Sequence, residues 1–151
     1  MIDPYHRWRE EPVYLLDDCF DCSDAYQALT SAGFLLRRHR ECFPSEGLGP
    51  ERGVKDSRII ELCGREGWIL VTTDANISRM FRKEIAQASD IAILATSHNQ
   101  VGNIMEWVAG LQKLKNRLDQ NNFRKKPRPW FARFNRQGEF TTGPQLVIWR
   151  D

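Results

Sequence analysis

Three aspartates stand at positions where an α/β chain carries its chemistry. Asp17 and Asp74 each follow an apolar run typical of a buried parallel strand, and Asp56 opens the helical pattern between them. Carboxylates crowded into one cleft repel each other unless a cation neutralises them, so such a cluster favours a bound divalent cation. The sequence therefore predicts a magnesium or manganese site formed by these three residues.

The elements around the aspartates alternate between strands and helices. Apolar runs predict strands at 13–16, 34–36, 68–73 and 91–95, with His39 still in the second strand. Apolar residues at helical spacing predict intervening helices near 23–33, 56–66, 77–85 and 101–118, with Met80 facing inward. Prolines and glycines predict a loop over residues 41–53. Alternation of this kind favours a three-layer, Rossmann-like α/β fold with a parallel sheet between helices. We expect residues 1–12 to form a polar N-terminal extension and residues 13–151 a single domain.

The expected strand order brings the first and third strands together. In an open sheet ordered 2-1-3-4, crossovers leave these two strands in opposite directions and open a crevice at their carboxyl ends. Asp17 and Asp74 would face that crevice, and Asp56 would reach it if its helix begins at the same edge. A capping role alone remains open for Asp56 and Asp74, because Asp is a favoured N-cap residue.

Three further polar residues are candidates for orienting the carboxylates or a water. They are Asp18, Thr73 and Asn76, with Thr72 as an alternative to Thr73. The alternative for Asp18 is a position in solvent. The alternative for Thr72, Thr73 and Asn76 is a role in a turn or as a helix cap.

The C-terminal part of the chain departs from the alternating pattern. Segments 131–135 and 139–142 flank a glycine turn and predict a hairpin, and Leu146–Trp149 is a candidate additional edge strand. Residues 113–136 hold nine basic side chains against one acid, within a chain of net charge +2. Such a run is typical of a nucleic-acid contact or of a solvated helix face, and the candidate RNA-binding residues are Arg124, Lys125, Lys126 and Arg128.

Other classes of site find less support. The four cysteines, which include Cys19 and Cys22, lack a second pair at metal-binding spacing and are expected to be reduced thiols rather than a zinc site. No nucleophile pairs with a histidine, and no glycine-rich phosphate loop follows the first strand. No apolar stretch approaches the roughly 20 residues that cross a bilayer, so we expect a cytoplasmic protein with no membrane contact.

Three segments together resemble the PIN-like domains of bacterial toxin-antitoxin ribonucleases. They are Tyr14–Asp18, Gly53–Ile60 and Gly67–Asn76, and Pro127–Phe140 is similar to the aromatic hairpin that closes many such sequences. The resemblance implies a VapC-like toxin that cleaves RNA, with Asp17, Asp56 and Asp74 binding Mg²⁺ or Mn²⁺. It also implies a cognate antitoxin as partner, and a homodimer is one option.

The chain departs from the family at one position and leaves two other functions open. Where a second acid commonly follows two residues after the third-strand Asp, this chain has Asn76. One alternative is therefore a noncatalytic PIN-like module that binds nucleic acid or a partner. The other is a receiver-like signalling domain. Such domains have a lysine after the fifth strand, and the absence of a convincing lysine in the region from Ala95 onward argues against this alternative.

Overall fold

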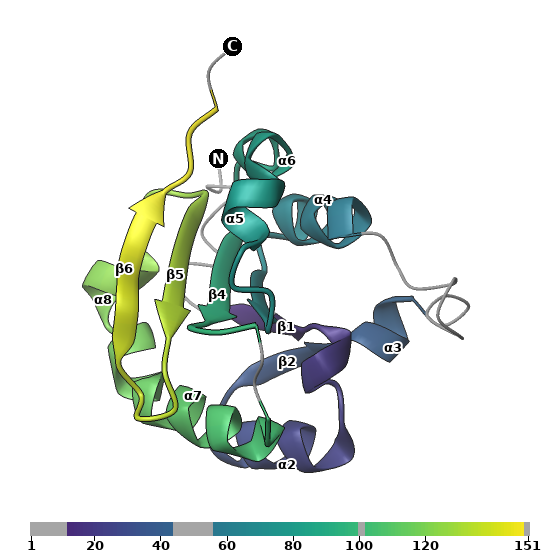
Figure 1. The fold of residues 1–151 in the computed structure, drawn as a ribbon, viewed down its shortest axis with the longest axis vertical. Helices are drawn as coiled ribbons and strands as arrows, with labels where there is room; N and C mark the ends of the chain where they lie inside the picture. The colour runs from purple at the N-terminus through teal and green to yellow at the C-terminus, as the bar shows by residue number, and fades with distance from the viewer. Residues whose placement is uncertain (1–11, 44–55, 100–101, 150–151) are drawn as a thin grey trace, which may run out of the picture.

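A six-stranded sheet forms the centre of the protein (Figure 1). The computed structural model describes residues 12–43, 56–99 and 102–149, so almost all of the predicted N-terminal extension and most of the loop predicted over residues 41–53 lie outside the described residues. The first five strands run parallel in the order β2-β1-β3-β4-β5, and β6 is antiparallel to β5. The strands are β1 Val13–Leu16, β2 Leu35–Arg38, β3 Ile69–Thr72, β4 Ala92–Thr96, β5 Trp130–Phe134 and β6 Phe140–Leu146. The predicted order and direction of the first four strands are confirmed.

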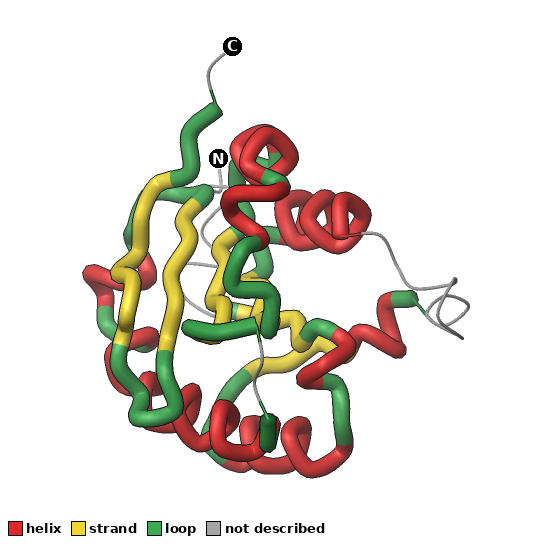
Figure 2. Tube along the Cα trace, viewed as in Figure 1, coloured by secondary structure: helices red, strands yellow, loops and turns green. Residues whose placement is uncertain are grey.

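Helices cover both faces of the sheet and complete a three-layer α/β arrangement (Figure 2). One face carries α2, α7 and α8, and the other carries α4, α5 and α6. Successive residues of β1 enter opposite cores, Leu15 on the α4 side and Leu16 on the α2 side, as the alternation of a strand requires. The helices are η1 Asp18–Phe20, α2 Ser23–Ser31, α3 His39–Cys42, α4 Asp56–Glu66, α5 Ile77–Met80, α6 Arg82–Gln87, α7 Ile104–Leu118 and α8 Asn121–Arg124. None of the described helices is long and apolar enough to span a bilayer.

The C-terminal hairpin packs its turn against α7 through two glycines. Gly138 has a φ of +78°, which favours glycine. A Cβ on Gly110 would lie 3.0 Å from the Cα of Arg136 and closer still to the carbonyl oxygen of Asn135. The predicted hairpin is confirmed, but the predicted separate edge strand at Leu146–Trp149 is wrong. The second strand of the hairpin itself extends to Leu146, and the residues beyond it are not in a strand.

Two local predictions are also wrong. The helix expected after Asp74 is broken at Phe81, whose φ of −119° and ψ of 31° lie outside the helical region. Ile77 and Ile85 are buried, but Met80 is 67% exposed rather than inward, because the single helical stripe does not continue through the break. His39 begins α3 and does not belong to the second strand.

Candidate active site

The switch point of the sheet lies between β1 and β3. These strands are paired in parallel, with Leu16 opposite Val71, and Asp17 and Asp74 follow them on the same carboxyl edge. The helix after β1 packs on one face of the sheet and the helices after β3 pack on the other, which is the arrangement that opens a crevice at this edge. Asp56, the first residue of α4, lies at the same edge, as its electrostatic coupling to Asp74 shows.

Asp56 lies within reach of the charges of the other two predicted aspartates. Burial raises the pKa of Asp17, and the negative charges of Asp18 and Asp56 raise it further. Burial also raises the pKa of Asp56, and there the additional charges are those of Asp74 and Asp18. Asp56 is therefore the carboxylate that couples to all the others, and the structure brings four acids to this edge.

Hydrogen bonds from Thr72 connect the acids of the two strands. Its hydroxyl donates to Oδ2 of Asp17 at 2.8 Å and accepts the backbone N–H of Asp74 at 3.2 Å. Oδ1 of Asp17 accepts the N–H of Asp18 at 2.9 Å. Of the two threonines considered, Thr72 rather than Thr73 thus orients Asp17, because it is the last residue of β3 and points towards β1.

A tight turn carries Asp74 and is held from two directions. Oδ1 of Asp74 accepts the backbone N–H of Asn76 at 3.0 Å, so it is the main chain of Asn76 that orients the carboxylate. The carbonyl oxygen of Ala75 accepts two hydrogen bonds from Arg133, from Nε at 2.9 Å and from Nη2 at 2.6 Å. The N–H of Ala75 donates to Oδ1 of Asn99 at 2.7 Å. Asp74 thus contributes to local turn structure and also faces the acidic edge.

Sequence reasoning missed Arg133 and Asn99 as residues that shape this site. Arg133 was counted only as one charge of the basic run, and Asn99 as part of a loop. The available signal was positional. Asn99 lies just beyond the carboxyl end of β4, at the same edge as the aspartates, and Arg133 lies one residue from the carboxyl end of β5.

A cluster of one buried aspartate and two arginines flanks the site on the β2 side. We call Asp21, Arg38 and Arg40 the arginine–aspartate cluster. Asp21 accepts Nε of Arg38 at 2.6 Å, and the backbone N–H and Nε of Arg40 at 2.9 and 3.2 Å. Although burial opposes ionisation, these hydrogen bonds lower the pKa of Asp21 overall. The cluster ties the end of η1, which begins beside Asp17, to the end of β2.

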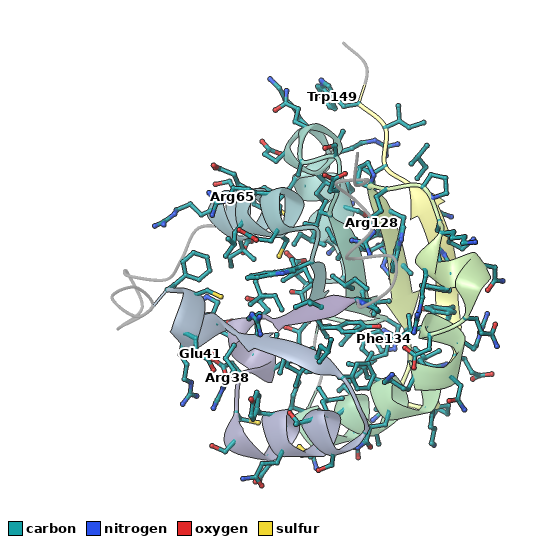
Figure 3. The ribbon with its side chains drawn as sticks, turned by 180° about the vertical axis from the view of Figure 1, so that it is seen from behind. Arg38, Glu41, Arg65, Arg128, Phe134 and Trp149 are labelled. Atoms are coloured by element: carbon teal, nitrogen blue, oxygen red, sulfur yellow. The ribbon has the colours of Figure 1, made fainter. Side chains whose placement is uncertain are left out.

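The predicted RNA-binding residues lie at the opposite edge of the sheet. Nη1 of Arg128 donates to the carbonyl oxygens of Gly67 and Asp90, at 2.7 and 3.0 Å, just before β3 and β4 begin. Arg124 forms an ion pair of 3.8 Å with Asp119 at the end of α7. Figure 3 shows Arg128 near the start of β5, well apart from Arg38 beside α3. Arg124, Lys125, Lys126 and Arg128 therefore do not border the aspartates.

The donor chemistry of the aspartates fits a hard divalent cation. Carboxylate oxygens are ligands that Mg²⁺ and Mn²⁺ prefer, and a cation would relieve the repulsion that raises the pKa values of Asp17 and Asp56. Within residues 12–43, 56–99 and 102–149, however, no three His, Cys, Asp or Glu side chains are placed to hold one ion as they stand. Side-chain rotation at this edge would be needed for joint coordination.

Comparison with known proteins returned no match. No family model matches the chain, and no curated protein or solved structure is detectably similar to it.

Proposed function

We propose that this protein is a PIN-like, metal-dependent endoribonuclease, and more specifically a VapC-like toxin that hydrolyses RNA phosphodiester bonds. The observation that carries the proposal is the proximity of Asp17, Asp56 and Asp74 at the switch point of a parallel sheet. The three-layer arrangement and the strand order agree with the resemblance in the sequence, but support it at the level of the fold alone.

In this proposal the three carboxylates hold Mg²⁺ or Mn²⁺. A bound ion of this kind polarises a phosphoryl oxygen and lowers the pKa of a water molecule. The hydroxyl of Thr72 orients one oxygen of Asp17, and the backbone N–H of Asn76 orients one oxygen of Asp74.

The remaining parts of the proposal concern cellular context. We propose that the protein acts on cellular RNA in the cytoplasm. Its proposed partners are a cognate antitoxin and a second copy of the chain. These follow from the resemblance between Tyr14–Asp18, Gly53–Ile60 and Gly67–Asn76 and the toxin family.

The test is RNA cleavage by the purified protein with Mn²⁺, with Mg²⁺ and with EDTA. The decisive variant is Asp56→Asn, which removes the central charge with little change in shape. Its matched control is Glu61→Gln, which removes an exposed acid from the same helix. We expect metal-dependent cleavage that Asp56→Asn abolishes and Glu61→Gln retains, with equal circular dichroism spectra. Equal cleavage by both variants would show that these aspartates are not the active site.

A second candidate is a noncatalytic module with the same fold. It is favoured by the absence, among the described residues, of three side chains already placed around one ion. The same assay separates the two functions. Wild-type protein that cleaves neither total RNA nor tRNA, and whose melting temperature does not rise with Mn²⁺, would be noncatalytic.

A further inference from the structure

The carboxyl edge of the sheet presents a problem for a polyanionic substrate. Asp17, Asp18, Asp56 and Asp74 gather there, and their charges repel phosphodiesters. A polyanion needs cations beside such a site. The predicted RNA-binding residues do not supply them, because β3 and β4 separate the two edges by four to five residues, or about 13–17 Å at roughly 3.3 Å per residue.

The arginine–aspartate cluster places cations on the correct edge. Arg38 is the residue opposite Leu16 in the pairing of β1 with β2, one position before Asp17. Asp17 and Asp21 flank the 3₁₀ helix η1, whose three residues advance by roughly 6 Å at about 2.0 Å per residue. Asp21 and the arginines that it binds therefore lie at the same end of β1 and β2 as Asp17.

The side chain of Arg40 is held by hydrogen bonds and is also exposed to solvent. Its side chain is 60% exposed, whereas that of Asp21 is 4% exposed. Besides Nε on the carboxylate, its Nη2 donates to the carbonyl oxygen of Asp21 at 2.8 Å. These bonds fix the plane of the guanidinium, and a fixed planar fork loses less entropy when it binds a phosphate.

Aromatic rings contact Arg38 of the cluster and a further arginine, Arg58. The guanidinium of Arg38 lies 4.9 Å from the centre of the Tyr26 ring, which holds it in place beside Asp21. Arg58, in the first turn of α4 and two residues after Asp56, lies 5.5 Å from the centre of the Phe43 ring at the end of α3. Asp21 thus binds two arginines, and Arg58 is a third arginine, beside Phe43.

We propose that Arg40 and Arg58 bind the backbone phosphates of single-stranded RNA beside the aspartates. Asp21 and Arg38 hold Arg40 in place for this contact. The inference rests on the proposed function for its substrate class. It assigns the RNA contact to the β2–α3–α4 side of the molecule rather than to residues 124–128.

The test is binding of fluorescein-labelled oligouridine, followed by anisotropy in EDTA over a series of salt concentrations. Each lost phosphate contact reduces the slope of log K against log salt by about 0.7 for a single strand. We expect this reduction in Arg40→Gln and in Arg58→Gln, and a larger one in the double variant. The matched control is Lys125→Gln with Lys126→Gln, which removes two charges at the other edge and should leave the slope unchanged.

Folding and function are controlled separately. Arg40→Lys keeps the charge and should retain most of the slope, and Arg58 does not belong to the cluster, so its variant tests the contact without disturbing Asp21. A slope that changes only in the lysine control overturns the proposal. Wild-type protein without salt-dependent binding also overturns it.

The outcome is independent of the cleavage assay. A reduced slope in the arginine variants, in a wild-type protein that neither cleaves RNA nor gains melting temperature with Mn²⁺, supports the RNA contact and refutes the nuclease. Cleavage that depends on Asp56, with unchanged slopes in the arginine variants, refutes the RNA contact and supports the nuclease.

Discussion

Arg133 offers a quantitative test of how the site is held together. Replacing it by Gln removes both hydrogen bonds to the carbonyl oxygen of Ala75, at 2.9 and 2.6 Å, in the turn that carries Asp74. It also removes a guanidinium that lies 5.0 Å from the centre of the Phe131 ring. We expect a less stable protein whose Asp74 turn is less firmly held.

The size of the effect follows from these contacts. A hydrogen bond from a charged donor contributes about 1.5–3 kcal/mol, and a cation on an aromatic face contributes roughly 0.5–2 kcal/mol. The two hydrogen bonds share one acceptor and Arg133 is half-buried, so their contributions do not add fully. The expected loss in the free energy of unfolding is about 2–3 kcal/mol.

The assay is urea unfolding followed by tryptophan fluorescence. Arg136→Gln is the matched control, because Arg136 also contacts an aromatic ring, 5.8 Å from the centre of the Trp107 ring. Its ion pair with Glu106, at 2.8 Å, lies where both side chains are about half exposed, and such exposed pairs contribute about 0–1 kcal/mol. Metal-dependent cleavage should fall in Arg133→Gln and persist in Arg136→Gln. Equal stability losses in the two variants would refute the reasoning.

Two further predictions concern charge and packing. The pKa of Asp17 in the folded state is raised above its usual 3.8. At a pH between 3.8 and this higher pKa, the folded state therefore binds more protons than the unfolded state. Ionisation of Asp17 at higher pH then costs stability. The stability of Asp17→Asn relative to wild type should therefore increase as the pH rises above about 4; a difference that does not change with pH in urea unfolding would contradict this. Gly110→Ala should cost about 1–3 kcal/mol through overpacking, because its new methyl group meets the backbone of Asn135 and Arg136. Gly143→Ala, with nothing within 4 Å of the new methyl group, is the control in thermal melts, and equal melting temperatures would show that the hairpin can move away from α7.

Much of the fold could be predicted because buried parallel strands are continuous apolar runs. All residues of β3 and β4 are buried, and both strands were located to within one or two residues. The positions of Asp17, Asp56 and Asp74 followed from the same pattern, since they stand at element boundaries. Met80 was misplaced because helical spacing alone does not reveal the break at Phe81.

The contacts that hold the site could not be predicted from local pattern. Arg133 reaches Ala75 across 58 residues of sequence, and Arg128 reaches Gly67 across 61. Both are basic residues of one short segment, yet they serve opposite edges of the sheet, because β5 runs from one edge to the other. Only the assembled sheet distinguishes an arginine near the start of that strand from one near its end.

The dependence of the Asp74 turn on β5 bears on when the site becomes complete during synthesis. Asp17 and Asp74 are synthesised before β5, which carries Arg133. Domains generally fold as units as they are made, and a nascent chain without β5 lacks the guanidinium that fixes Ala75. For a protein proposed to cut RNA, this order delays the finished site until β5 has been synthesised.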